Sequence, residues 1–111
     1  MKILVTGAGG FIGHHLVAYL KSKGHWVRGA DIKYPEFESS AADEFLIGDL
    51  RSLDNCENAT KGIEDVYHLA ADMGGIGYIS ANHAHLTRNN ILINSHMLEA
   101  ARLSEVKRYL Y

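Results

Sequence analysis

The fold of this chain is decided by the stretch Ile3-Leu4-Val5-Thr6-Gly7-Ala8-Gly9-Gly10-Phe11-Ile12-Gly13. A short apolar run, expected to be a β-strand over residues 2–6, leads into glycines at Gly7, Gly10 and Gly13. Apolar residues with helical spacing follow at once. The stretch therefore predicts a strand, a tight glycine turn and a helix that begins at the turn.

Each glycine has a separate physical reason. Gly7 lets the chain turn sharply out of the strand, Gly10 leaves room for a pyrophosphate beside the backbone, and Gly13 lets the helix pack closely on the sheet. The free N–H groups at the helix start, around Phe11 and Ile12, carry a partial positive charge that favours phosphate. The turn is therefore a candidate dinucleotide site, with a glycine-rich turn that binds nothing as the alternative.

Asp31 ends the next apolar run, eighteen residues after Gly13. A carboxylate at this distance can accept hydrogen bonds from the adenosine ribose hydroxyls. It also repels a 2′-phosphate, which favours NAD over NADP, although Lys33 nearby acts against this preference. The alternative is a solvated acid at the end of a strand.

Composition limits the possible functions. At 111 residues, with a net charge of −2, the chain is expected to form one domain (1–111) without a nucleic-acid partner. No apolar run reaches the roughly 20 residues of a membrane span, and no signal peptide is expected. The single cysteine, Cys56, indicates a reducing cytoplasm and is interpreted as a structural thiol. The seven histidines lack the spacing of a helical metal site, so no metal is expected.

The rest of the chain alternates strand and helix patterns, which predicts an α/β fold with a parallel sheet. Further strands are expected at 26–31, 44–48, 66–71 and 106–111, and helices at 52–61 and 81–103. Right-handed crossovers give a Rossmann-type sheet of strand order 3-2-1-4-5 with helices on both faces. Four segments then converge at the carboxyl ends of the strands: the glycine turn, Asp31, Asp49-Leu50 and Leu69-Ala70-Ala71.

The run from Thr6 to Gly13 resembles the fingerprint of the extended short-chain dehydrogenase/reductase family. The resemblance implies that Asp49 and Leu50 meet the adenine, with an acid at a helix N-cap as the alternative for Asp49. It also implies that Leu69-Ala70-Ala71 lets the ribose and nicotinamide side of the cofactor pass close to the backbone. A plain buried strand of small residues is the alternative.

The run Asp72-Met73-Gly74-Gly75-Ile76-Gly77-Tyr78, with Asn89-Asn90 and residues 94–102, resembles the GDP-mannose 3,5-epimerases. The resemblance implies a sugar-nucleotide substrate that bound NAD transiently oxidises. Met73, Gly74 and Gly75 are its candidate substrate residues, and a flexible glycine turn is the alternative. A stand-alone dinucleotide-binding module and a related dehydratase or epimerase remain the rival functions.

No catalytic residue is assigned. Tyr19 and Lys23 match the Tyr-x-x-x-Lys pair of the family, but they lie on the first helix, whereas the family places its pair after the fifth strand. The chain is therefore expected to be the NAD-binding part of a longer enzyme, truncated after strand 5 and inactive alone. An unpaired edge at 106–111 and the apolar face of helix 81–103 predict a homodimer.

Overall fold

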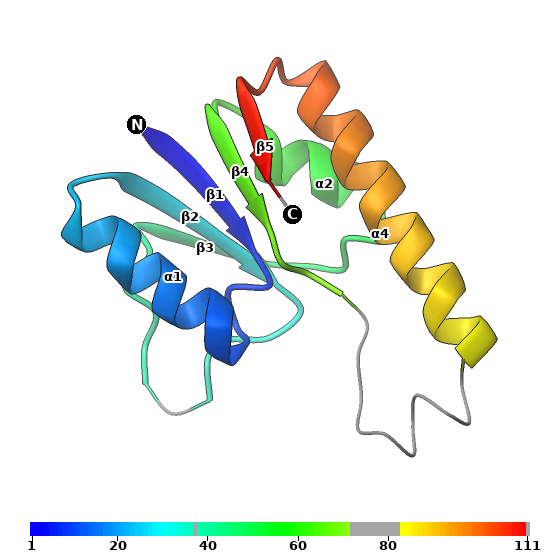
Figure 1. Ribbon diagram of the computed structural model, residues 1–111, viewed down its shortest axis with the longest axis horizontal. Coiled ribbons are helices and arrows are strands. Elements are labelled where there is room, and N and C mark those ends of the chain that lie inside the picture. Colours follow the sequence, from blue (N-terminus) through cyan, green and yellow to red (C-terminus); the bar gives the residue numbers. More distant parts are fainter. Residues whose placement is uncertain (37, 72–82, 111) are drawn as a thin grey trace.

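The computed structural model describes residues 1–36, 38–71 and 83–110, which build a five-stranded parallel sheet with helices on both faces (Figure 1). In chain order the elements are β1 (Lys2–Thr6), α1 (Phe11–Ser22), β2 (Trp26–Asp31), β3 (Glu44–Ile47), α2 (Leu53–Thr60), β4 (Asp65–His68), α4 (His83–Leu103) and β5 (Arg108–Leu110). The strands lie in the order β3-β2-β1-β4-β5, and all four pairings are parallel. The predicted order 3-2-1-4-5 is confirmed, with β1 at the centre.

Strand β1 is buried on both faces, as expected for the central strand of a parallel sheet. Its side chains alternate: Ile3 and Val5 pack with the buried residues of α1, whereas Leu4 packs with those of α2 and α4. Figure 1 shows α1 on one side of the sheet and α2 with α4 on the other. The sheet therefore separates two apolar clusters, and β1 contributes to both.

Helix boundaries follow local chemistry. After α1, Gly24 adopts a φ of 86°, the left-handed conformation predicted for the residue that closes this helix. Before α2, the Ser52 hydroxyl accepts a hydrogen bond from the N–H of Asn55, so Ser52 is the N-cap. The predicted helix at 52–61 is thus α2 together with its two caps. None of the helices in the described parts of the chain is long and apolar enough to cross a membrane.

The predicted strand at 66–71 is wrong at its carboxyl end, because β4 stops at His68. The partner strand β1 ends at Thr6, directly opposite His68. The N–H of Leu69 is shared between the carbonyl oxygen and the hydroxyl of Thr6, and the N–H of Ala70 bonds to the hydroxyl alone. Leu69-Ala70-Ala71 therefore belongs to the connection after β4. At the far edge β5 covers only Arg108–Leu110, because its neighbour β4 pairs with it only from Asp65 to Tyr67.

Candidate functional site

A cleft of about 610 Å³ lies at the carboxyl ends of the central strands. It is lined by four segments and by one end of α4: Gly7, Gly10, residues 31–33, residues 48–51, residues 69–71, His85, Asn89 and Ile93. Eight of the residues predicted from the sequence share this one cleft: Gly7, Gly10, Asp31, Asp49, Leu50, Leu69, Ala70 and Ala71. The carboxyl-edge convergence expected from the strand order is thus a feature of the structure.

The glycines of the turn have different surroundings. Gly7 has a φ of 70°, and a Cβ there would stand 2.8 Å from the carbonyl carbon of Leu69. A Cβ on Gly13 would stand 2.1 Å from the carbonyl oxygen of Gly7. A Cβ on Gly10, by contrast, would meet only the Gly7 oxygen, at 3.4 Å. Protein therefore fills the space beside Gly7 and Gly13, whereas the space beside Gly10 opens into the cleft.

Helix α1 begins at this turn without a side-chain cap. Its first two side chains, Phe11 and Ile12, are exposed, so they do not seal the helix start. Phe11 lines a neighbouring cavity of about 330 Å³ that shares Gly10 with the main cleft. Gly13 is buried beneath the turn. The N-terminal turn of α1 thus offers backbone N–H groups next to open space, an arrangement suited to an anion.

Asp31 ends β2 and ties it to the glycine turn. Its Oδ2 accepts a hydrogen bond from the N–H of Gly9 at 2.8 Å, and its Oδ1 accepts one from the N–H of Ile32 at 2.6 Å. The carboxylate is therefore fixed by backbone donors at the rim of the cleft. Sequence reasoning missed Gly9, whose Cβ would stand 2.1 Å from the carbonyl oxygen of Lys33; only the tertiary structure brings these two segments together.

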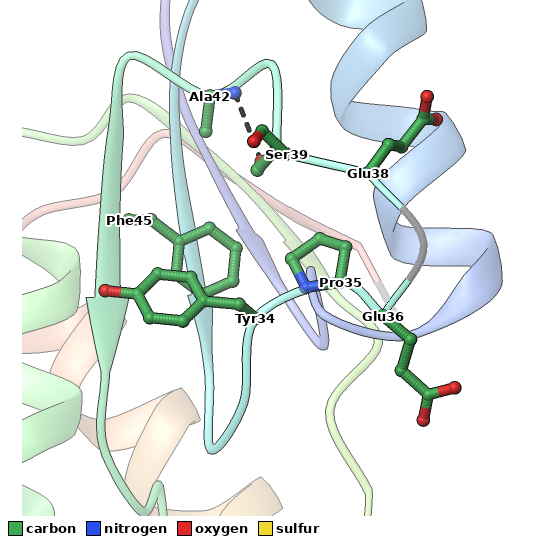
Figure 2. Close-up of a pocket in the computed structure, with 8 residues that line it drawn as sticks. Tyr34, Pro35, Glu36, Glu38, Ser39, Ala42 and Phe45 are labelled. Carbon is green, nitrogen blue, oxygen red and sulfur yellow. Dashed lines mark hydrogen bonds between the residues drawn. The ribbon is translucent and has the colours of Figure 1, made fainter.

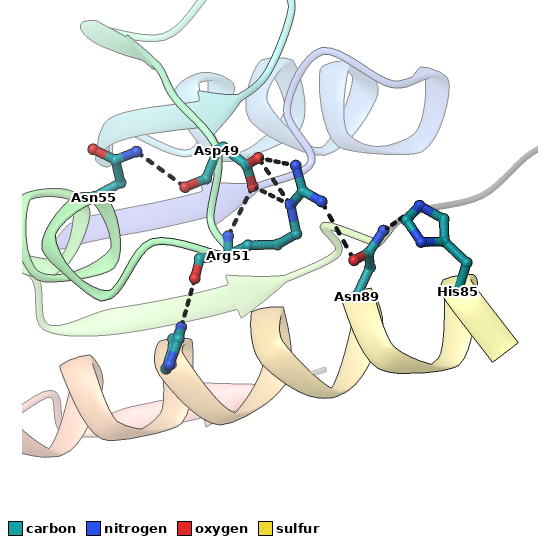
Figure 3. Close-up of polar contacts among 6 residues, drawn as sticks. Asp49, Arg51, Asn55, His85 and Asn89 are labelled. Atoms are coloured by element: carbon teal, nitrogen blue, oxygen red, sulfur yellow. Dashed lines mark hydrogen bonds and ion pairs between the residues drawn. The ribbon is translucent and has the colours of Figure 1, made fainter.

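Asp49 lies at the opposite wall in a chain of polar contacts (Figure 3). Its carboxylate accepts hydrogen bonds from Nε and Nη2 of Arg51, the shortest at 2.6 Å, and this lowers the pKa of Asp49. Arg51 also donates to Oδ1 of Asn89 at 3.3 Å, and Asn89 donates to Nε2 of His85 at 3.1 Å. The alternative of an N-cap role for Asp49 is wrong, because Ser52 caps α2.

Arg51, Asn89 and His85 line the cleft but were not predicted from the sequence. Asn89 is buried, whereas the Arg51 side chain is about half exposed. The nearest signal was Asn89 itself, which was used for the resemblance but was not placed at a site. The contact between α4 and the segment after β3 joins residues 38 positions apart, so no local pattern predicts it.

Other predicted features lie away from the cleft. Lys23 Nζ stands 5.4 Å from the centre of the exposed Tyr19 ring near the end of α1, and neither residue lines the cleft. Cys56 is buried beneath the sheet and donates to the carbonyl oxygen of Leu50. Burial raises the pKa of the Cys56 thiol to about 12, consistent with a structural role. Within the described residues, no three histidine, cysteine or acidic side chains form a metal-binding group.

A further cavity of about 480 Å³ lies under the connection between β2 and β3 (Figure 2). The rings of Tyr34 and Phe45 form its floor, with ring centres 5.0 Å apart. Figure 2 shows Glu36 and Glu38 pointing away from these rings. Glu36 pairs with Lys33, and Glu38 pairs with His14. None of the residues predicted to bind the cofactor lines this cavity, and all of them belong to the described part of the chain. The predicted substrate residues Met73, Gly74 and Gly75 lie outside the described residues.

The sequence is similar to those of two plant enzymes over its whole length. GDP-mannose 3,5-epimerase 1 of Oryza sativa subsp. japonica is 48% identical over 113 residues, which cover 100% of this chain and 30% of that protein. GDP-mannose 3,5-epimerase of Arabidopsis thaliana is 46% identical with the same coverage. The chain thus spans about 30% of the length of these relatives.

The solved structure of MoeE5 in complex with UDP-glucuronic acid and NAD is similar over 98% of this chain and 35% of its own, with 34% identity and a TM-score of 0.84. A family model described as the NAD dependent epimerase/dehydratase family matches residues 3–111, nearly the whole sequence. The chain belongs to the NAD dependent epimerase/dehydratase family.

Proposed function

We propose that this chain is the NAD-binding portion of a sugar-nucleotide epimerase that acts on GDP-mannose. The observation that carries the proposal is the cleft at the carboxyl edge, where Gly10 opens toward unfilled space between the start of α1 and the fixed carboxylate of Asp31. Sequence identity of 46–48% to GDP-mannose 3,5-epimerases supports the choice of substrate.

Each side of the cleft has a proposed partner on the cofactor. The N–H groups at the start of α1, near Phe11 and Ile12, face the pyrophosphate, and Gly10 leaves room for it. Asp31 still has carboxylate lone pairs for the ribose hydroxyls, since each oxygen can accept more than one hydrogen bond. The structure fits the cofactor here, because the anionic pyrophosphate meets backbone donors, and the one carboxylate at the rim faces hydroxyls.

The remaining predicted residues bind the two ends of the cofactor. Asp49 and Leu50 are the proposed contacts of the adenine. The lowered pKa of Asp49 keeps its carboxylate ionised, so the carboxylate can accept a hydrogen bond from the amino group of the adenine. Leu69, Ala70 and Ala71 form the wall toward the nicotinamide end. Bound NAD would supply reversible oxidation of a sugar hydroxyl, which acidifies the neighbouring C–H bonds.

The substrate residues are proposed from the sequence alone: Met73, Gly74 and Gly75. We assign no base to this chain, because Tyr19 and Lys23 lie outside the cleft. A homodimer is proposed from the exposed apolar side chains Ile91 and Leu98 on α4. A cytoplasmic location is proposed from the single buried thiol.

The proposal is tested by titrating the chain with NAD in a calorimeter, followed by binding of GDP-mannose, UDP-glucose and dTDP-glucose to the NAD-loaded chain by saturation-transfer NMR. We expect NAD binding and a preference for GDP-mannose. Absence of NAD binding would overturn the proposal. NAD binding with equal sugar-nucleotide signals would favour a dinucleotide-binding module, and a preference for another sugar would favour a related epimerase or dehydratase. NAD binding without any sugar-nucleotide signal would contradict the proposed substrate role of Met73, Gly74 and Gly75.

A further inference from the structure

A network of three polar side chains behind the cleft joins β1, β4 and α4: Thr6 and His68 are buried, and Asn94 is exposed. Thr6 Oγ1 lies 2.7 Å from Nδ1 of His68, and Nε2 of His68 lies 2.8 Å from Oδ1 of Asn94. Thr6 is fully buried and His68 is 5% exposed, so water does not substitute for the bond between them, whereas the bond to Asn94 is only partly buried. None of the residues Thr6, His68 and Asn94 was predicted as a site residue.

The direction of each hydrogen bond in this polar network follows from the contacts of the Thr6 hydroxyl. Its oxygen accepts the N–H groups of Leu69 at 3.0 Å and Ala70 at 3.1 Å, which occupy both of its lone pairs. The hydroxyl hydrogen must therefore be donated to Nδ1 of His68. His68 then carries its only ring hydrogen on Nε2, which donates to Asn94, and the imidazole is neutral. Burial lowers the pKa of His68, in agreement with this neutral form.

The Leu69–Ala70 peptide, which this polar network holds through Thr6, forms part of the cleft. Leu69 and Ala70 both line it, and the peptide between them is packed against the turn at Gly7, where a Cβ would stand 2.9 Å from the Ala70 nitrogen. Asn94 lies on α4, the helix that also contributes Asn89 and Ile93 to the cleft. The network therefore connects α4 with the ends of β1 and β4, and the segments that follow these two strands line the same cleft as α4.

We propose that His68 is a positioning residue of the cofactor cleft. Its imidazole holds the Thr6 hydroxyl in the one orientation that fixes the Leu69–Ala70 peptide, and it ties that peptide to α4 through Asn94. The inference rests on the proposed function of the cleft in NAD binding. His68 acts through Thr6 and the peptide, so it touches neither cofactor nor substrate.

Two amide substitutions separate the two bonds of the imidazole. In asparagine, Oδ1 is attached to Cγ as Nδ1 is in histidine, so His68→Asn keeps an acceptor for Thr6 but does not reach Asn94. In glutamine, Nε2 is two bonds beyond Cγ as in histidine, so His68→Gln can reach Asn94 but lacks the acceptor for Thr6. His68→Phe keeps a ring and removes both bonds.

The test measures NAD affinity by calorimetry and the melting temperature for these three variants of the chain. We expect His68→Gln and His68→Phe to weaken NAD binding about fivefold to tenfold, the cost of one misdirected buried hydrogen bond, and His68→Asn to stay within about twofold of the parent chain. His68→Asn leaves the larger cavity and should melt below His68→Gln. Affinity and stability should therefore rank the two amides in opposite orders.

A second measurement reads the imidazole directly, without cofactor. The ¹⁵N shifts of His68 should be those of the neutral ring with its hydrogen on Nε2. A hydrogen on Nδ1, or NAD affinities that simply follow the melting temperatures, would overturn the inference and leave the proposed function standing. A parent chain that binds no NAD would instead overturn the proposed function, and this inference with it.

Discussion

The two walls of the cleft are built in different ways. The wall formed by the glycine turn is backbone: Gly7 and Gly10 present main-chain atoms, and Asp31 is held there by two N–H groups. The opposite wall is made of side chains, in which Asp49, Arg51 and Asn89 hold one another. The first wall is fixed by the path of one continuous segment, and the second depends on contacts between distant segments.

This difference predicts how each wall responds to substitution. A backbone wall has no side chain to move aside, so an added group there either blocks the ligand or strains the chain. A wall of paired, half-exposed side chains can rearrange, and ion pairs of this kind contribute little to stability. We therefore expect large effects at the glycine turn and small ones at the Asp49 wall.

The largest effect is expected from Gly10→Val. The valine side chain would occupy the open space beside Gly10, where we place the pyrophosphate, so NAD affinity should fall by more than about 100-fold, equivalent to roughly 3 kcal/mol. Gly10 is in an extended conformation that any residue can adopt, and a Cβ there meets only one oxygen, at 3.4 Å. Calorimetry measures the affinity, and thermal unfolding should show a loss of only about 1 kcal/mol for the poorer N-cap residue.

Gly10→Ala provides the graded control, because a single methyl group fills less of the space and should cause a smaller loss of affinity. Equal NAD affinities of the parent chain and Gly10→Val would show that the pyrophosphate lies elsewhere.

Gly7→Ala should instead damage the fold. The φ of 70° is costly for alanine, and its Cβ would stand 2.8 Å from the Leu69 backbone. We expect a loss of about 3 kcal/mol in the free energy of unfolding, and hence a melting temperature lower by about 10–20 °C. Circular dichroism checks this, and a melting temperature unchanged from the parent chain would mean that the turn relaxes easily.

Asp31 should select between cofactors. At about 4 Å its charge would repel a 2′-phosphate by roughly 1–4 kcal/mol, so NAD should bind at least about fivefold more tightly than NADP. Asp31→Asn also disturbs the hydrogen bonds to Gly9 and Ile32, which weakens both cofactors together. The ratio of the NADP dissociation constant to the NAD dissociation constant isolates the effect of the Asp31 charge. We expect the substitution to reduce this ratio by about tenfold. Competition in which NADP matches NAD on the parent chain would contradict the role of Asp31.

The same difference explains how far the sequence could predict the structure. The bounds of β1 and β2 were predicted correctly, as were the left-handed conformation of Gly24 and the position of Asp31 at the carboxyl end of β2. These features depend on local residue types, because few residues besides glycine tolerate a positive φ. They also depend on a strand order that general topology rules restrict to a few possibilities.

Two of the misses depended on side chains from distant segments. The apolar run through Leu69–Ala71 was predicted to continue the strand, but the N–H of Ala70 bonds to the Thr6 hydroxyl and not to a strand carbonyl. The pairing of Arg51 with Asn89 needs α4 to be placed against the segment after β3.

A modest effect is expected at the side-chain wall. Arg51→Ala removes the cation that holds the Asp49 carboxylate, and NAD affinity should fall only about twofold to threefold, equivalent to roughly 0.5 kcal/mol. Arg102→Ala is the matched control, since Arg102 pairs with Glu99 at the same 2.6 Å on α4 but does not line the cleft. Calorimetry on both variants compares them, and a loss at Arg51 as large as that at Gly10 would break the distinction between the two walls.

The smallest expected effect is a dependence of stability on pH that arises from His68. Burial lowers its pKa in the folded chain below the ordinary value of 6.5. As the pH falls through 6.5, the unfolded chain therefore takes up a proton before the folded chain does, and stability decreases until the pH reaches the lower folded pKa. The carboxyl group of Asp49, whose pKa is lowered, stays ionised in this window.

We expect the melting temperature to fall between about pH 7.5 and pH 5.5. It should fall less in His68→Asn, because asparagine has no titratable group at this position. If the melting temperature falls equally with pH in the parent chain and in His68→Asn, the effect belongs to other groups. That outcome would argue against a neutral His68 imidazole behind the cleft.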